Sequence, residues 1–236
     1  MKTKIFVISV AILTSANFVL ASVPVIVSGG AGRRALGNLC NHAQDQVTSG
    51  DLTGAMRNVE SVLQADPKFW PALYVRAQIF MAQGKYGLAI QDCNEALRQY
   101  RGFIDASAMR AVINAQLGKY AEALKELNYL ISIHPASVTL ARVLKQRAWL
   151  QATCPNASFR NGQQAVKDAK AACSIMVWKD ENTIDTLAAA YAEIGDFDSA
   201  VRYAQQALAV KDTSPRDSKR IQRHIQLFQQ HKPIRL

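Results

Sequence analysis

The feature that most constrains this chain is a glycine-led string that recurs at a fixed interval. Gly50, Gly84 and Gly118 lie 34 residues apart (84 − 50 and 118 − 84), and a further copy begins at Gly195. Each glycine is followed by an apolar residue two positions on and by an alanine five positions on. A glycine here can supply the turn that ends one helix, and the alanine lets a second helix approach closely. The spacing therefore predicts a stack of helical hairpins.

The helix that follows each glycine carries apolar residues at the spacing of one helical face. Its apolar positions are Ala55, Val59, Val62 and Leu63 in the first copy, Ala89, Cys93, Ala96 and Leu97 in the second, Ala123, Leu127, Leu130 and Ile131 in the third, and Ala200, Ala204, Ala207 and Leu208 in the last. Such amphipathic helices cannot bury their apolar faces alone. Neighbouring hairpins must cover them.

This pattern resembles the tetratricopeptide repeat family over roughly residues 36–212. The resemblance implies an all-α, right-handed superhelical solenoid of about five antiparallel hairpins, with a concave groove formed by the first helix of each. Between Pro135 and Gly195 the period breaks, and we expect an atypical hairpin at 138–177. Its first helix should span 138–153 and its second 162–176, with Asn161 as N-cap. The string Ala148-Trp149-Leu150-Gln151-Ala152-Thr153-Cys154-Pro155 is similar to a recurrent module of bacterial proteins of this family.

The two ends of the chain differ from the repeat region. Lys2 and Lys4 precede an apolar run that ends in small residues at Ala21, which predicts a signal peptide at 1–21 and an exported, periplasmic or extracellular protein. An uncleaved membrane anchor is the alternative. Residues 22–35 are expected to form a flexible leader. Residues 213–236 are expected to hold a basic tail and a capping helix, from about 215 to 231, that covers the last repeat.

The resemblance also indicates which residues face the groove. The best candidates for binding another protein or peptide, whose identity the sequence does not give, are Tyr74, Val75, Gln78, Met81, Met109, Val112 and Gln116. Asn182, Asp185, Thr186 and Glu193 fall at corresponding positions further along. The family's clamp for the carboxylate ends of chaperones is absent, because the clamp positions hold Cys40, Gln44, Val75, Asp105 and Met109 rather than cations and amides. We therefore predict a protein-interaction scaffold in the cell envelope.

The strongly basic composition suggests an alternative function. The formal net charge is +10, and cations cluster near the carboxyl end at Arg216, Lys219, Arg220 and Arg223. This basic patch could bind nucleic acid or an anionic surface, or could be a solvated tail. We favour the interpretation as a solvated tail, and nucleic acid is not the expected partner.

No arrangement in the sequence indicates catalysis, a cofactor or a metal. The four histidines lack metal-ligand spacing, and the acids Asp180, Glu181, Asp185, Asp196 and Asp198 are assigned to helix caps and turns. No serine or cysteine has a recognisable base beside it. The chain has four cysteines, and the pairing of Cys154 with Cys173 is left open.

Overall fold

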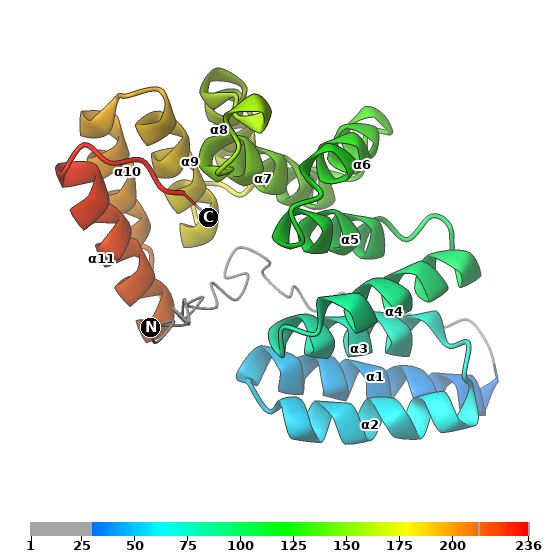
Figure 1. Cartoon of the computed structure of the whole chain (residues 1–236). Helices are drawn as coiled ribbons and strands as arrows, with labels where there is room; N and C mark the ends of the chain where they lie inside the picture. Colours follow the sequence, from blue (N-terminus) through cyan, green and yellow to red (C-terminus); the bar gives the residue numbers. More distant parts are fainter. Residues whose placement is uncertain (1–29, 212, 236) are drawn as a thin grey trace, which may run out of the picture.

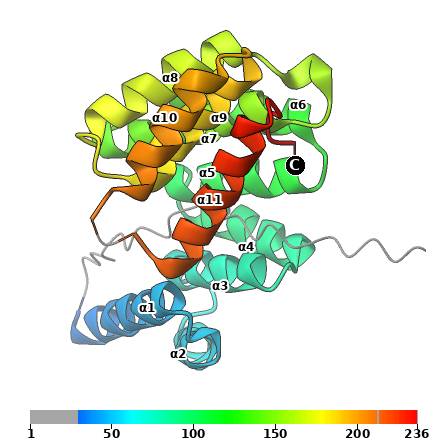
Figure 2. The ribbon, with the colours of Figure 1, turned by 90° about the vertical axis from the view of Figure 1, so that its left-hand side faces the viewer.

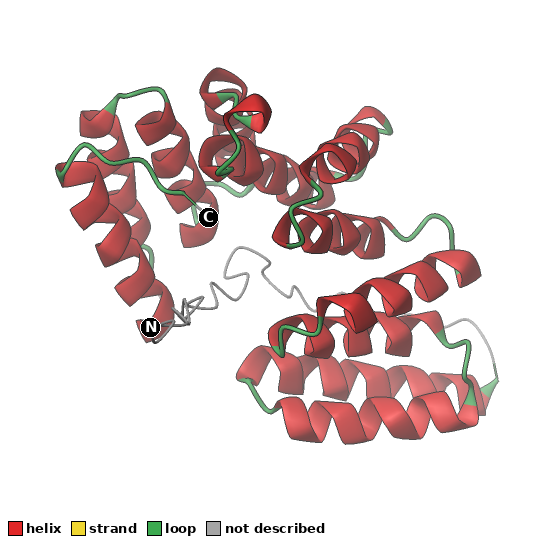
Figure 3. Cartoon of the chain, viewed as in Figure 1, coloured by secondary structure: helices red, strands yellow, loops and turns green. Residues whose placement is uncertain are grey.

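The structure, a computed structural model, describes residues 30–211 and 213–235. This part of the chain consists of helices and loops (Figure 3). Its elements are α1 (Ala31–Ser49), α2 (Leu52–Ala65), α3 (Trp70–Ala82), α4 (Tyr86–Gln99), α5 (Ile104–Gln116), α6 (Tyr120–Ser132), α7 (Ser137–Thr153), the short 3-10 helix η1 (Ala157–Phe159), α8 (Gly162–Ile175), α9 (Glu181–Glu193), α10 (Phe197–Leu208) and α11 (Pro215–Gln229).

The helices pack as five consecutive hairpins, α1/α2, α3/α4, α5/α6, α7/α8 and α9/α10, with α11 against α10 and α9. The stack curves, so that the first hairpins and α11 lie at opposite ends of an arc (Figure 1). Turning the molecule shows α11 crossing the inner side of the arc (Figure 2). The predicted all-helical solenoid with a carboxyl-terminal capping helix is confirmed.

The repeating string forms the turns and the close helix contacts that its sequence predicts. Its glycines, Gly50, Gly84, Gly118 and Gly195, have φ between +72° and +91°, a left-handed conformation that side chains with a Cβ rarely adopt. The alanines five positions on, Ala55, Ala89, Ala123 and Ala200, are fully buried between paired helices. The sequence period thus fixes both the turn and the close helix approach in each hairpin.

The predicted boundaries need one correction. The leader was expected to reach residue 35, but α1 begins at Ala31, because the run from Arg33 to Leu36 consists of good helix formers and Leu36 packs against the core. The predicted signal peptide, 1–21, lies outside the described residues. In the atypical hairpin, α7 and α8 match the expected helices to within a residue at each end, and the Asn161 side chain accepts a hydrogen bond from the Gln164 amide.

An arginine on the first helix of three successive hairpins joins the repeats. Arg76, Arg110 and Arg147 bind Asp92, Glu126 and Asp168 on the paired helix. Arg110 also donates to Asn94, and Arg147 to Asn128, in the hairpin before. The bonds of Arg110 and Arg147 hold the third and fourth hairpins in register with their predecessors.

The cysteines are structural in the described chain. Cys40, Cys93, Cys154 and Cys173 are all free and fully buried, and the structure has no disulfide between Cys154 and Cys173. Burial raises the pKa of Cys40, Cys93 and Cys173 to about 12. These thiols therefore stay protonated at neutral pH and are poor nucleophiles.

Candidate functional site

Most of the predicted groove residues turn out to be core residues. Tyr74, Val75, Gln78, Met81 and Met109 are each at most 5% exposed, so the prediction that they form an open binding surface is wrong. Val112 and Gln116 on α5 are half-buried and remain accessible.

The cause lies in how the neighbouring hairpin covers α3. Phe103, in the connection that leads into α5, packs edge-on against Tyr74 with ring centroids 4.7 Å apart, and against Trp70 at 4.6 Å. Tyr100 lies 5.2 Å from the Trp70 ring. This aromatic cluster fills the space that the repeat frame leaves open beside α3.

Two buried amides stand out within this covered part of the concave face. Gln44 on α1 and Gln78 on α3 lie 34 residues apart, one repeat, and are 4% and 0% exposed. The Nε2 of Gln44 and the Nε2 and Oε1 of Gln78 make no hydrogen bond of good geometry among the described residues, and the polar neighbour of the Gln78 amide is the Tyr74 hydroxyl. A buried polar group without a partner costs about 1–3 kcal/mol. Because both side chains are at most 4% exposed, a ligand would reach these amides only when the side chains that cover them move aside.

Further along, ion pairs connect the first helices of successive hairpins. Asp105 on α5 pairs with Arg142 on α7 at 3.0 Å, and Lys145 on α7 pairs with Asp180 at the start of α9 at 3.5 Å. Burial raises the pKa of Asp105 against the opposing effect of Arg142. Burial likewise lowers the pKa of Lys145, which Asp180 partly offsets. These two ion pairs therefore lie along the inner side of the solenoid, where burial shields them from water.

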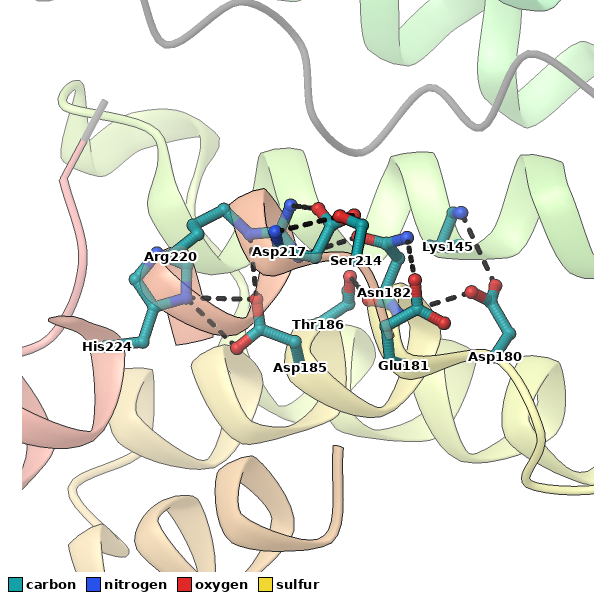
Figure 4. Close-up of polar contacts among 10 residues, drawn as sticks. All are labelled: Lys145, Asp180, Glu181, Asn182, Asp185, Thr186, Ser214, Asp217, Arg220 and His224. Atoms are coloured by element: carbon teal, nitrogen blue, oxygen red, sulfur yellow. Dashed lines mark hydrogen bonds and ion pairs between the residues drawn. The ribbon is translucent and has the colours of Figure 1, made fainter. Parts of the chain in front are cut away.

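The line ends in a buried network that fastens α11 to α9 (Figure 4). Asp185 is fully buried and accepts a hydrogen bond from His224 Nδ1, 2.9 Å from Oδ2. A carboxylate can only accept, so this histidine nitrogen carries the proton. Arg220 donates to Asn182 Oδ1 at 2.6 Å and to Asp217, and its Nε lies 3.5 Å from Asp185. The capping helix is thus held by polar contacts as well as by its apolar side chains.

The predicted basic patch is only partly a surface feature. Arg216, Lys219 and Arg223 are exposed on α11, whereas Arg220 is 9% exposed and points inward to the network. Including Arg220 in an exposed patch was wrong, because its guanidinium is bound to Asp217 and Asn182. Three exposed cations spaced along one helix remain.

Of the acids predicted to be caps, some are caps and one is not. Asp180 and Asp196 are N-caps whose side chains accept from the amides of Asn182 and Ser199, as predicted. Asp185 is the exception, since it lies in the middle of α9 and binds α11. The sequence placed Asp185 at a groove position, which was the available signal that it is not a cap. Its partner His224 could not be predicted, because it lies 39 residues away in the chain.

Within residues 30–211 and 213–235, no group of three or more His, Cys, Asp or Glu side chains is placed to hold a metal ion. No helix of that same part has the length and apolar character needed to cross a bilayer. What the inner side presents is polar and apolar contact area contributed by successive first helices.

Comparison with known proteins identifies the repeat. Residues 40–102 match the model of the tetratricopeptide repeat family. This stretch of the chain is therefore similar to that family. The structure is also similar to the crystal structure of a thermophilic tetratricopeptide repeat protein in Thermus thermophilus. The TM-score is 0.69 and the sequence identity 17%, and the match covers 81% of this chain and 100% of that one. At this identity the likeness concerns the fold alone.

Two curated relatives are tetratricopeptide repeat and J domain-containing co-chaperones named DNJ1. The protein of Cryptococcus neoformans is 27% identical over 118 residues, covering 47% of this chain and 23% of the co-chaperone. That of Fusarium oxysporum is 26% identical over 181 residues, covering 75% of this chain and 34% of the co-chaperone. The chain therefore matches no more than 34% of the length of these relatives. Fold and relatives together support a protein–protein interaction role.

Proposed function

We propose that this protein is an interaction scaffold of the cell envelope that holds an extended segment of a partner protein on the concave side of its first hairpins. The observation that carries the proposal is the pair of poorly satisfied buried amides of Gln44 and Gln78, one repeat apart on α1 and α3, which a partner would reach by displacing the side chains that cover them. An extended polypeptide offers main-chain N–H and C=O groups at intervals along its length, and an amide side chain can bind both.

The accessible residues beside these amides suit the same ligand. Val112 and Gln116 on α5 are half-buried and continue the concave side toward the middle of the arc. They supply an apolar contact and a further amide. The partner's side chains need only fit this surface loosely, because main-chain bonds would provide the fixed contacts.

The test is a double variant, Gln44→Leu with Gln78→Leu. We expect the variant to be more stable than the native chain, by about 1 kcal/mol per site, because two poorly satisfied buried amides are replaced by apolar groups of similar size. We expect partner capture to fall at least about fivefold, because the bonds that offset the amide burial are lost. Urea unfolding measures the first effect, and crosslinked pull-down from an envelope extract measures the second.

A matched control changes the exposed cations of α11, Arg216→Gln, Lys219→Gln and Arg223→Gln. A partner captured by the native chain and by this control, but lost by the leucine variant, supports the proposal. Capture that depends on the α11 cations instead, or that survives the leucine substitutions unchanged, would refute it.

Export is part of the same proposal and rests on the apolar run and small residues before Ser22. We expect the protein recovered from the envelope fraction of its host to begin at Ser22 when its amino terminus is determined by mass spectrometry. Recovery from the cytoplasmic fraction with residues 1–21 still attached would contradict the assignment.

A further inference from the structure

Several large apolar side chains protrude from one edge of the solenoid, where the second helix of one hairpin connects to the first helix of the next. We name this set the loop edge. Its members and their exposed fractions are Val177 67%, Tyr129 63%, Val138 56%, Ile133 44% and Trp178 36%. They come from the end of α6, the start of α7 and the α8–α9 connection.

These segments meet in space although they are distant in sequence. The buried residues Ala141, Leu144 and Ala172 form a small core that packs against Ile131 of α6 and Met176 after α8. The neighbours of those two residues, Ile133 and Val177, are left outside this core and exposed. Figure 2 shows the α8–α9 and α10–α11 connections on one side and the α7–α8 connection on the other.

The α8–α9 connection holds its apolar residues outward at a conformational cost. Val177 and Trp178 have φ of 53° and 57°, a left-handed conformation that is unusual for any residue with a Cβ and rare for a β-branched one. Backbone bonds fix the turn, with Trp178 N–H donating to Cys173 O at 2.9 Å and Lys179 N–H to Met176 O at 3.1 Å. Strain of this kind that is not offset by burial of Val177 points to a function at that position.

Stacked aromatic rings and cations support this turn. Trp178 stacks on Tyr203 at 6.0 Å, and Tyr203 on Tyr191 at 5.2 Å. Lys170 lies over the Tyr191 ring at 5.2 Å. The indole is therefore held in place although it is 36% exposed.

The charge beside the loop edge is positive. Lys125 lies one helical turn before Tyr129, and Lys179 follows Trp178, whereas Lys170 lies at the far end of the aromatic stack, over Tyr191; all three lysines are exposed. The ion pairs among the described residues use none of these three lysines. The nearest acid in the α8–α9 connection, Asp180, is already paired with Lys145.

We propose that the loop edge rests on an anionic lipid bilayer surface, with its aromatic and aliphatic side chains at headgroup depth and its lysines against the anionic lipids. Side chains that protrude from separate connections along one edge fit a flat partner. Aromatic residues beside cations are the composition that favours the bilayer interface. A second copy of the chain, meeting through the same edge, would bring its lysines against like charges.

The test uses a reporter at the edge of the full chain. Because all four native cysteines are fully buried, an environment-sensitive dye on Val177→Cys labels this position selectively. The matched control is Leu117→Cys, an apolar residue 43% exposed at the end of α5, on the opposite edge. Each labelled protein is mixed with vesicles of phosphatidylcholine containing about a quarter phosphatidylglycerol, a fraction chosen to give the bilayer a negative surface.

We expect dye emission to rise at least about twofold at position 177 and to stay unchanged at position 117, since only the loop edge would enter the interface. Changing Lys125, Lys170 and Lys179 to Gln in the labelled protein should weaken the vesicle response by about fivefold for each cation removed. Because the reporter is local, membrane attachment by another part of the chain does not imitate this result.

Three outcomes would overturn the proposal. They are no response at position 177, an equal response at position 117, and a rise at position 177 that needs higher protein concentration but no vesicles. The last outcome would identify a second copy as the occupant. A companion variant, Val177→Asn, should keep its stability because asparagine tolerates the left-handed conformation, while its vesicle binding falls.

Discussion

Replacing Asp185 with alanine is expected to lower the free energy of unfolding by about 3 kcal/mol, because it removes the buried acceptor of His224 and leaves Arg220 short of one partner. Asp185 is fully buried, and the side chain of Arg220 is 10% exposed, so the pair is shielded from bulk solvent. The loss lies at the low end for a broken buried pair, since Arg220 keeps Asp217 and Asn182. Urea unfolding gives the magnitude.

The matched control for this variant is Asp198→Ala. Asp198 is exposed in the first turn of α10, where a carboxylate contributes less than about 1 kcal/mol through the helix dipole. Hydrogen exchange should accelerate in α11 of the Asp185 variant and leave α1 to α4 as they were. Equal losses for the two variants would show that the network does not fasten the capping helix.

Replacing Phe69 with alanine is expected to cost about 3–5 kcal/mol, the cost of emptying a large site in a packed core. Phe69 is 1% exposed at the start of α3 and belongs to the core shared by α1, α2, α3, α4 and the beginning of α5. In a solenoid each hairpin contacts only its neighbours, so the damage should stay in this half. Hydrogen exchange should therefore accelerate in α1 to α4 and change little in α9 to α11.

Leu88→Ala is the control for the Phe69 substitution. Leu88 lies in α4 of the same half and is 43% exposed, so its truncation should cost less than about 1 kcal/mol. If Phe69→Ala instead loosened α9 to α11 as strongly as α1 to α4, the solenoid would unfold as one unit. The two large substitutions thus probe opposite ends of the arc.

Both predictions concern how hairpins are joined, and this is where sequence and structure differ in what they reveal. The string that begins at Gly84 predicts the turn, the start of α4 and the burial of Ala89, because all of these depend on contacts within one hairpin. Asn161 likewise predicts the start of α8, since a cap bonds to an amide three residues on.

Which residues are exposed on the concave side could not be predicted from the repeat period. Tyr74 lies at a groove position in the repeat frame, yet Phe103 from the next hairpin covers it. Gln78 is in the same position in the frame as Gln44, but nothing in the period indicates that both amides are left poorly satisfied. The period describes one unit, whereas exposure depends on the rotation and distance between units.

The sequence by itself determined the helices, the turns between them and the all-α repeat architecture, because a 34-residue period and its glycines act over short stretches of chain. Only the tertiary structure decided that Asp185 binds His224 across 39 residues, that Arg220 points inward, and that Val177 and Tyr129 emerge on one edge. The physical reason is that these features depend on where α11 and successive hairpins come to rest against each other, and side-chain contacts between distant segments leave no periodic trace in the sequence.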